Sequence, residues 1–413
     1  MSTRSKLILA LTLLGIALIA SLFRSQPSHG KPAIRIGVVH SLSGTMAHSE
    51  KPLVDAVRLA VEEINARGGL LGRQVEMIVA DGKSDNDIFA AEAERLITEE
   101  KVSALFACWT SACRKAVKPV VERHKHLMFY PLQYEGLEQS PNILYTGSAP
   151  NQQIIPGARW ALQKFGQRIY LVGSDYEFPR IANLIIRDLI TATGGKIVAD
   201  HYLPLGSTGS KEIAAIIADI RLKKPDVVLN TLNGDSNAAF FTALLDAGLA
   251  SQPLVSFSVA EGEMLAWGGT RLKEHYAVWS YFQSLPEEEN QRFVAAWQKR
   301  FGSDHPTSDP VEAAYVGTHL WARAVHDVGA SDPERVSPAL LRQSIRSPSG
   351  IAAVDAGTRH LWKTLRIGKV RPDGQFDQVL ASSEALRPTP WPNYRSREAW
   401  NALLETASQK MQP

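Results

Sequence analysis

Short apolar segments typical of strands alternate with longer amphipathic segments typical of helices, and this alternation constrains the fold more than any other feature. A first series runs from a strand at residues 34–39 to another at 127–130. A second series runs from a helix at 152–165 to a strand at 254–256. The intervening helices are long enough to serve as crossovers between parallel strands. The pattern therefore predicts an α/β protein with two doubly wound parallel-sheet lobes.

Length and composition fit two lobes and exclude several classes of function. A chain of 413 residues is too long for one hydrophobic core. Its 45% hydrophobic and 21% charged residues are ordinary for a soluble globular protein. The net charge is +3 and both signs alternate along the predicted helices, so nucleic acid is not an expected partner. The eleven His residues show no metal-ligand spacing, and the sequence contains no nucleophile elbow. We therefore expect that the protein binds no metal or cofactor and has no enzymatic activity.

The N-terminal segment has the pattern of an export signal. Arg4 and Lys6 precede residues 7–23, which contain no charged residue. This length lies between the apolar region of a signal peptide, about 7–15 residues, and a membrane-spanning helix, about 17–25. Residues 1–30 are therefore either a cleaved signal peptide or a retained membrane anchor. Either alternative places the rest of the chain in the periplasm or on the outer face of the cytoplasmic membrane.

The turn between a predicted strand at 102–107 and a predicted helix at 111–124 carries Trp109, Thr110 and Ser111. Backbone N–H groups without partners and the positive end of the helix dipole lie at such a turn. In open α/β sheets, ligands bind at the carboxyl ends of the strands. Together with the hydroxyl groups, these donors favour the capture of a small ligand's oxygen, with the aromatic ring beside it.

Cys108 and Cys113 lie on either side of this turn. Cys108 ends the predicted strand, and Cys113 faces into the predicted helix. We expect two separate buried thiols rather than a disulfide, although an extracytoplasmic compartment permits one.

Other predicted strand ends carry further polar and aromatic groups: Tyr130 and Gln133, Tyr176, Asp235, and Glu261. If the two lobes face each other, these groups converge with Ser111. Such a site offers donors for a carbonyl oxygen and acceptors for NH₂ groups, which suits a small, flat, neutral amide. Asp235 is equally well explained as a cap of the helix that follows it.

At these residues the chain resembles the urea-binding proteins of ABC uptake systems, in the amide-binding branch of type I periplasmic binding proteins. The matching blocks extend over residues 34–392. They are residues 40–46, 108–115, 129–136, 140–143, 149–153, 173–176, 230–237, 309–315, 360–363 and 374–376.

The resemblance implies two lobes joined by a three-crossover hinge that closes over urea or a short-chain amide, which is then delivered to membrane permease subunits. We expect an N-terminal lobe of 31–148 plus 285–350, a C-terminal lobe of 149–284 plus 351–395, and a tail of 396–413. The resemblance also implies the ligand-binding residues. They are Trp109, Thr110, Ser111, Tyr130, Gln133 and Tyr176, with Asp235 and Glu261 added.

The chain departs from the family pattern at Gly262, which interrupts a run of glutamates between Glu261 and Glu263. Two other functions remain open. A binding protein for branched-chain amino acids needs a carboxylate for the ligand's ammonium and a roomy apolar pocket. A membrane-anchored amide sensor needs residues 7–23 to be retained.

Overall fold

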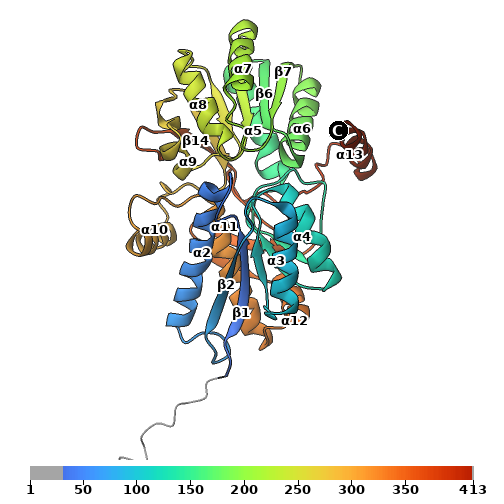
Figure 1. Cartoon of the computed structure of the whole chain (residues 1–413), viewed down its shortest axis with the longest axis vertical. Coiled ribbons are helices and arrows are strands. Elements are labelled where there is room, and N and C mark those ends of the chain that lie inside the picture. Colours follow the sequence, from blue (N-terminus) through green and yellow to red (C-terminus); the bar gives the residue numbers. More distant parts are fainter. Residues whose placement is uncertain (1–30, 412–413) are drawn as a thin grey trace, which may run out of the picture. The chain divides into compact units, whose positions relative to one another are not determined.

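Two mixed sheets, made mostly of parallel strands, organise the computed structural model, which describes residues 31–411 (Figure 1). The predicted signal peptide or anchor at 1–30 lies outside the described residues. Among the helices that are described, none combines the length and apolar character needed to cross a membrane.

The first sheet has the strand order β11-β12-β13-β5-β4-β3-β1-β2. Its strands are β1 (Ile34–His40), β2 (Val75–Asp81), β3 (Leu105–Ala107), β4 (Met128–Tyr130), β5 (Ile143–Tyr145), β11 (Ser344–Ser347), β12 (Gly350–Asp355) and β13 (His360–Leu361). Pairings from β2 through to β13 are parallel, whereas β11–β12 and β12–β13 are antiparallel. The lobe's helices are α2 (Ala47–Ala66), α3 (Asn86–Thr98), α4 (Ser111–Arg123), α11 (Asp309–Val328) and α12 (Pro333–Leu340).

The second sheet has the order β15-β14-β10-β9-β8-β6-β7. Its strands are β6 (Arg168–Ser174), β7 (Lys196–Leu203), β8 (Val227–Thr231), β9 (Leu254–Ser256), β10 (His275–Trp279), β14 (Arg366–Val370) and β15 (Phe376–Ala381). The first five are parallel, whereas β14 pairs antiparallel with β10 and forms an antiparallel hairpin with β15. The lobe's helices are α5 (Ile154–Phe165), α6 (Glu177–Ala192), α7 (Ser210–Lys223), α8 (Ser236–Asp246) and α9 (Glu261–Ala266), with 3₁₀ turns η1 (Pro150–Gln152) and η2 (Gly269–Arg271).

Helices cover the sheets as the amphipathic patterns predict. In the first lobe α2 packs against α11, and α3 packs against α4 (Figure 1). The central strands are buried along their whole length, as strands of a sheet covered on both faces should be. The prediction of two α/β lobes is therefore confirmed.

The chain passes between the two sheets three times: after β5, after β10 and after β13. The second passage includes α10 (Glu288–Phe301). The first two passages touch, because the hydroxyl groups of Ser148 and Ser280 lie 3.0 Å apart.

The third passage lies later than expected. Residues 351–361 were assigned to the C-terminal lobe, but β12 and β13 pair within the first sheet. The hairpin of β11 and β12 keeps the chain at the edge of that sheet, and a weakly patterned edge hairpin is hard to assign from sequence.

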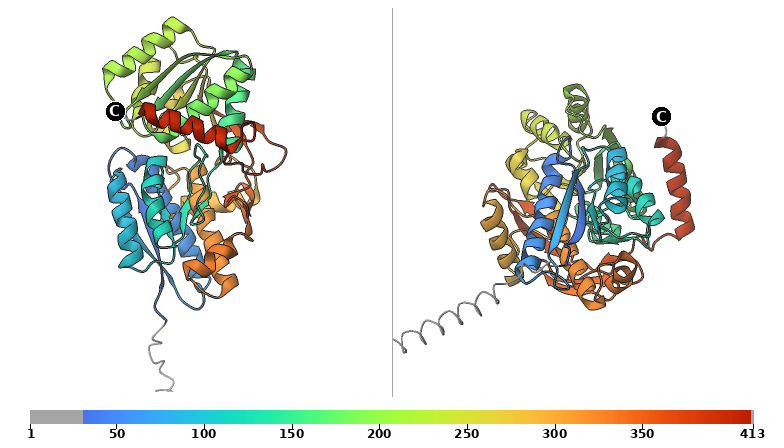
Figure 2. Two further views of the ribbon diagram at one scale, coloured as in Figure 1. Left: turned by 90° about the vertical axis from the view of Figure 1, so that its right-hand side faces the viewer. Right: turned by 60° about the horizontal axis from the view of Figure 1, so that its bottom comes forward.

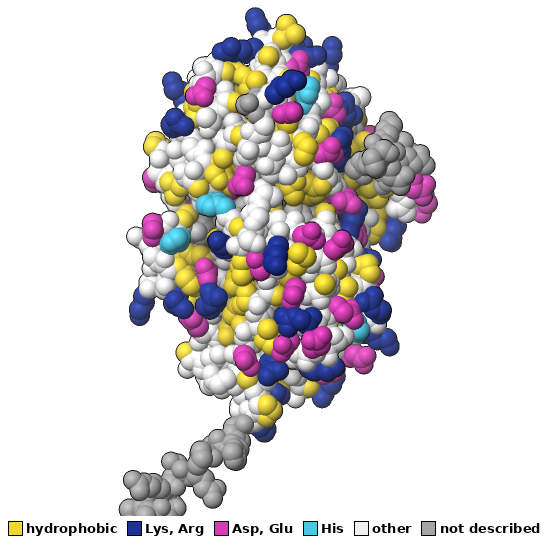
Figure 3. Space-filling view, viewed as in Figure 1, with side chains coloured by type: hydrophobic (Ala, Val, Ile, Leu, Met, Phe, Trp, Pro, Cys, Tyr) yellow, Lys and Arg dark blue, Asp and Glu magenta, His cyan; other side chains and the backbone are white. Residues whose placement is uncertain are grey.

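The predicted tail at 396–413 is mostly helix α13 (Arg397–Met411), which lies beside α6 (Figure 2). Trp400 is fully buried in the core of the second lobe, and Arg395 forms an ion pair with Asp188. On the face shown in Figure 3, side chains of Lys and Arg are interspersed with those of Asp and Glu.

Candidate ligand-binding cleft

The carboxyl ends of the strands of the two sheets meet each other across a cleft. Trp109 Nε1, after β3, donates to Asn233 Oδ1, after β8, at 3.1 Å. Gln133, after β4, donates from Nε2 to the backbone oxygen of Phe257 at 3.0 Å and to Ser258 Oγ at 2.8 Å. These bonds join residues of different lobes, so the structure shows the lobes in a closed arrangement.

Close backbone contact also accompanies closure. Gly234 has a φ of +61°, and a Cβ atom on it would lie 2.9 Å from Thr45 Oγ1 of the opposite lobe. The N–H group of the next residue, Asp235, donates to the same Oγ1 at 3.4 Å. Glycine therefore satisfies both the positive φ and the approach of the other lobe.

A small cavity lies between the lobes at these contacts, and we call it the Trp109 cavity. Its empty space is about 150 Å³, in gaps narrower than a water molecule. The side chains that line it come from both lobes. They are Trp109, Ser111, Tyr130, Gln133, Tyr176, Phe178 and Asn233.

Ser111 lies in a buried network of charged groups. Its Oγ donates to Glu135 Oε2 at 2.6 Å and accepts from an Arg114 NH group at 2.9 Å, while Arg114 also binds Glu135 Oε1 at 2.9 Å. The hydroxyl hydrogen is therefore already used within the protein. Glu138 also pairs with Arg114, which holds the pKa of the Glu138 carboxyl below its usual range although burial opposes this.

Two tyrosines of the cavity are neutral hydrogen-bonding groups. Burial raises the pKa of the Tyr130 and Tyr176 hydroxyls, so both stay protonated at neutral pH. Tyr130 donates to the backbone oxygen of Trp109 at 2.7 Å, which fixes the strand end relative to the turn.

Gln133 presents an acceptor at the cavity. Its Nε2 is used in the bonds to the other lobe, but its Oε1 is buried and has no partner in the described chain. A buried acceptor without a partner costs about 1–3 kcal/mol, which a ligand N–H group would recover.

Three predicted residues do not line the Trp109 cavity. Thr110 caps α4, because its Oγ1 accepts from Cys113 N at 3.1 Å, and it lines a neighbouring chamber. Asp235 precedes α8 without capping it, and Asn233 of the same turn lines the cavity instead. Glu261 is buried at the start of α9 with Oε1 accepting from Gln283 N at 2.8 Å, and burial raises its pKa to about 8.

Cys108 and Cys113 form a disulfide, so the expectation of two separate thiols is wrong. Cys108 has a φ of +72°, which turns the chain at the end of β3. The Cα atoms of the two residues are consequently 5.6 Å apart, within bonding range. The disulfide closes a short ring around the turn that carries Trp109 and Ser111.

The neighbouring chamber adjoins the Trp109 cavity at Tyr176, which lines both. We call it the Glu50 chamber. It has about 570 Å³ of empty space and is wide enough for water. Its lining residues are Ser41, Met46, Glu50, Ser84, Asn86, Phe89, Thr110, Ala112, Tyr176 and Leu205.

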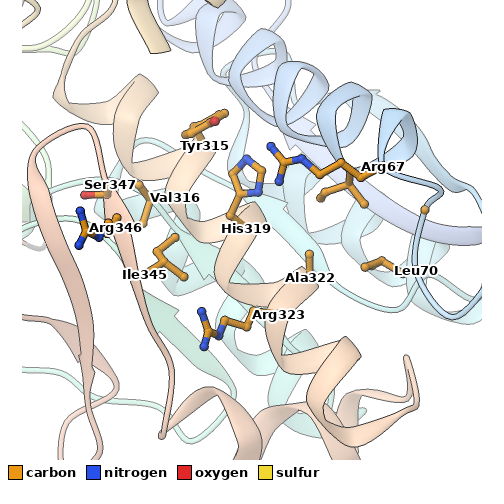
Figure 4. Close-up of a pocket in the computed structure, with 12 residues that line it drawn as sticks. Arg67, Leu70, Tyr315, Val316, His319, Ala322, Arg323, Ile345, Arg346 and Ser347 are labelled. Atoms are coloured by element: carbon orange, nitrogen blue, oxygen red, sulfur yellow. The ribbon is translucent and has the colours of Figure 1, made fainter. Parts of the chain in front are cut away.

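A further pocket lies on the first lobe alone, between α2, α11 and β11 (Figure 4). Tyr315 and His319 lie on its wall, and Arg67, Arg323 and Arg346 stand around it. Because one lobe supplies all its residues, closure of the lobes does not shape this pocket. Among the described residues, no group of three or more His, Cys, Asp or Glu side chains is arranged to hold a metal ion.

Residues 34–397 match the periplasmic binding protein domain family. Over 350 residues the chain is 25% identical to Leu/Ile/Val-binding protein homolog 6 of Brucella melitensis, covering 82% of this chain and 87% of that protein. A 116-residue segment is 34% identical to limonene hydroxylase of Geobacillus stearothermophilus. That alignment spans 28% of this chain and 21% of the hydroxylase, so it carries no argument about activity.

Solved structures show the same two-lobed architecture. A solute binding protein of an ABC transporter from Rhodopseudomonas palustris, in complex with p-hydroxybenzoic acid, is 25% identical with a TM-score of 0.77, over 87% of this chain and 99% of that one. A branched-chain amino acid transporter substrate binding protein from Streptococcus pneumoniae, in complex with isoleucine, is 20% identical with a TM-score of 0.75. That alignment covers 86% of this chain and 100% of the other, and it supports the fold alone.

Proposed function

This chain belongs to the periplasmic binding protein domain family, and from that premise we propose that it captures urea or a short-chain amide for an ABC transporter. Membership makes it a binding protein rather than an enzyme. Closure of the lobes would hold the ligand, and the closed form would be recognised by membrane permease subunits. In this proposal residues 31–413 work in the periplasm or on the outer face of the cytoplasmic membrane.

The observation that carries the proposal is the composition of the Trp109 cavity. Trp109, Ser111, Tyr130, Gln133 and Tyr176 come together there from separate strand ends of both lobes. Aromatic faces suit a planar ligand, and Gln133 Oε1 is an acceptor for its NH₂ group. The N–H groups of Ser111 and Ala112, which precede the capped N–H of Cys113 in α4, are donors for its carbonyl.

The size of the cavity favours a ligand of few atoms. Its empty space, about 150 Å³ in all, consists of gaps narrower than a water molecule. The lining side chains would have to move apart to admit any ligand, and this movement is smallest for a molecule the size of urea.

The ligands named for the similar structures are p-hydroxybenzoic acid and isoleucine, not amides. A relative of similar length is named a Leu/Ile/Val-binding protein homolog, which keeps branched-chain amino acids as a second candidate. An amide sensor that remains anchored in the membrane would use the same cavity and differ in its partner.

Titration calorimetry on purified protein, unfolded and refolded to remove carried-over ligand, tests the proposal. Urea, acetamide, formamide, leucine and p-hydroxybenzoate are titrated in turn. One-site binding of urea or a small amide is the expected result. Binding of leucine or p-hydroxybenzoate without any amide would overturn the assignment. The mass of the exported protein separates a cleaved signal from a retained anchor.

A further inference from the structure

The Glu50 chamber is built like a second part of the same ligand site. It lies at the carboxyl ends of β1, β2 and β3, where the turns to α2, α3 and α4 begin. Tyr176 and Leu205 of the other lobe complete its wall. Closure of the lobes therefore shapes this chamber as it shapes the Trp109 cavity.

Glu50 is the charged group of the chamber. Its residue is 1% exposed. Its Oε2 accepts from Ser41 N at 2.9 Å and lies 3.1 Å from His40 Nδ1. The side chain is thus held in one orientation at the chamber wall. None of the described residues that line the chamber is Lys or Arg.

A buried carboxylate is costly unless it is paired, because the protein replaces only part of its hydration. Among the described residues, the titratable side chain bonded to Glu50 is His40. His40 is itself fully buried, and its Nε2 has no partner in the described structure. A ligand cation beside Glu50 would give the buried carboxylate a further partner.

The three hydroxyl groups of Ser41, Ser84 and Thr110 in the chamber wall are already engaged, whereas the wall also includes Asn86 and Tyr176. Ser84 Oγ donates to the backbone oxygen of Ser43 at 3.1 Å and accepts from Met46 N at 3.1 Å. Ser41 Oγ accepts from Ser84 N at 3.0 Å, and Thr110 caps α4. The Glu50 carboxylate is consequently the charged acceptor that the chamber offers, beside the neutral amide of Asn86.

Two helix N-termini border the chamber and by themselves would favour an anion. In α3, the N–H groups of Asp87 and Ile88 are bonded to the carboxylate of Asp85, which offsets that helix dipole. In α4, the N–H group of Cys113 is bonded to Thr110. A ligand cation at Glu50 is therefore not opposed by two uncapped helices.

We propose that the Glu50 chamber binds the ammonium group of a ligand whose amide group occupies the Trp109 cavity, so that short amides carrying an amino group belong to this protein's ligands. The inference rests on the proposed function, since it assigns the amide to the first cavity. Tyr176 lines both spaces, so the two adjoin at its side chain.

Matched pairs of ligands test the inference on the wild-type protein. Glycinamide is compared with acetamide, and β-alaninamide with propionamide, by calorimetry at pH 6.5. The members of a pair differ chiefly in the ammonium group. We expect at least one ammonium-bearing amide to bind about tenfold or more tightly than its neutral partner, as a charge-assisted hydrogen bond allows.

The Glu50→Gln variant keeps the shape of the side chain and removes its charge. The ratio of affinities within the pair should fall to about one, while Glu62→Gln, an exposed glutamate of the same helix, should keep the wild-type ratio. The melting temperature of each variant is measured first, and the wild-type comparison decides the question if Glu50→Gln does not fold.

The outcomes separate the two proposals. Binding of neutral amides without preference for the ammonium-bearing partner overturns the inference and leaves the proposed function standing. Failure of every amide overturns both. Tighter binding of glycine than of glycinamide overturns the inference in favour of an amino-acid site.

Discussion

Gln133 donates two hydrogen bonds from one lobe to the other, and its replacement by alanine tests whether they stabilise the closed arrangement. The acceptors, the backbone oxygen of Phe257 and Ser258 Oγ, lie 3.0 Å and 2.8 Å from Nε2. Each such bond contributes about 0.5–1.5 kcal/mol net, so the loss of both should shift the equilibrium toward the open form by about 1–3 kcal/mol.

The affinity for ligand should fall accordingly. When the open form predominates without ligand, the apparent affinity is proportional to the population of the closed form. A shift of about 1–3 kcal/mol then corresponds to a loss of roughly 5-fold to 150-fold. Loss of the acceptor Oε1 would add to this if a ligand N–H group binds it.

Calorimetry with urea and acetamide measures the affinity, and small-angle X-ray scattering with and without ligand measures closure. Gln139→Ala is the matched control, because Gln139 Nε2 donates to the backbone oxygen of Gly357 at 2.9 Å within the first lobe. Unchanged affinity in Gln133→Ala, or an equal loss in the control, would refute the role assigned to these bonds.

Four further changes have expected outcomes. Ser111→Ala should weaken amide binding by about 1–3 kcal/mol, since the turn loses its link to the buried charges; calorimetry that finds no change would move the site elsewhere. Arg114→Met should lower the free energy of unfolding by about 3–5 kcal/mol, because buried carboxylates lose their cation; guanidinium denaturation measures this. Reduction of Cys108–Cys113 should lower it by about 2 kcal/mol, the low end for a short ring, and a matched melting temperature with and without reductant would contradict this. The pKa of Glu261 is raised to about 8 in the folded protein, so its contribution to stability is present below the unfolded pKa near 4.5 and is lost as pH rises through 8. Glu261→Gln should flatten that pH dependence, measured with guanidinium because urea is the proposed ligand.

The strand ends were predictable because alternation locates the carboxyl edge of a parallel sheet, and polar residues there are conspicuous. The strand ends and the family resemblance together indicated five residues that line the Trp109 cavity: Trp109, Ser111, Tyr130, Gln133 and Tyr176. It could not choose among the residues of one turn: Asn233 lines the cavity and Asp235 does not, since Gly234 between them turns the chain at a positive φ. A run of polar residues in the sequence does not reveal which of their side chains the turn directs into the cavity.

Other differences between the sequence-based predictions and the structure arise from tertiary packing, which a local sequence pattern does not predict. Glu261 was predicted to bind ligand, yet it is buried against the second passage between the sheets, at Gln283. Glu50, in contrast, cannot be distinguished in the sequence from the other glutamates of the predicted helices. Its burial beside His40 and Ser41 becomes visible only when α2 is placed against β1.

The late position of β11, β12 and β13 has a consequence for how the protein is made. During synthesis, β5 emerges about two hundred residues before its neighbour β13, so the edge of the first sheet stays open while strands β6 to β10 of the second lobe are produced. An open edge of a sheet is a template for pairing with other chains. A fragment that ends at Tyr145 should therefore aggregate rather than fold, and the nascent chain would benefit from a chaperone until residue 361 has been added.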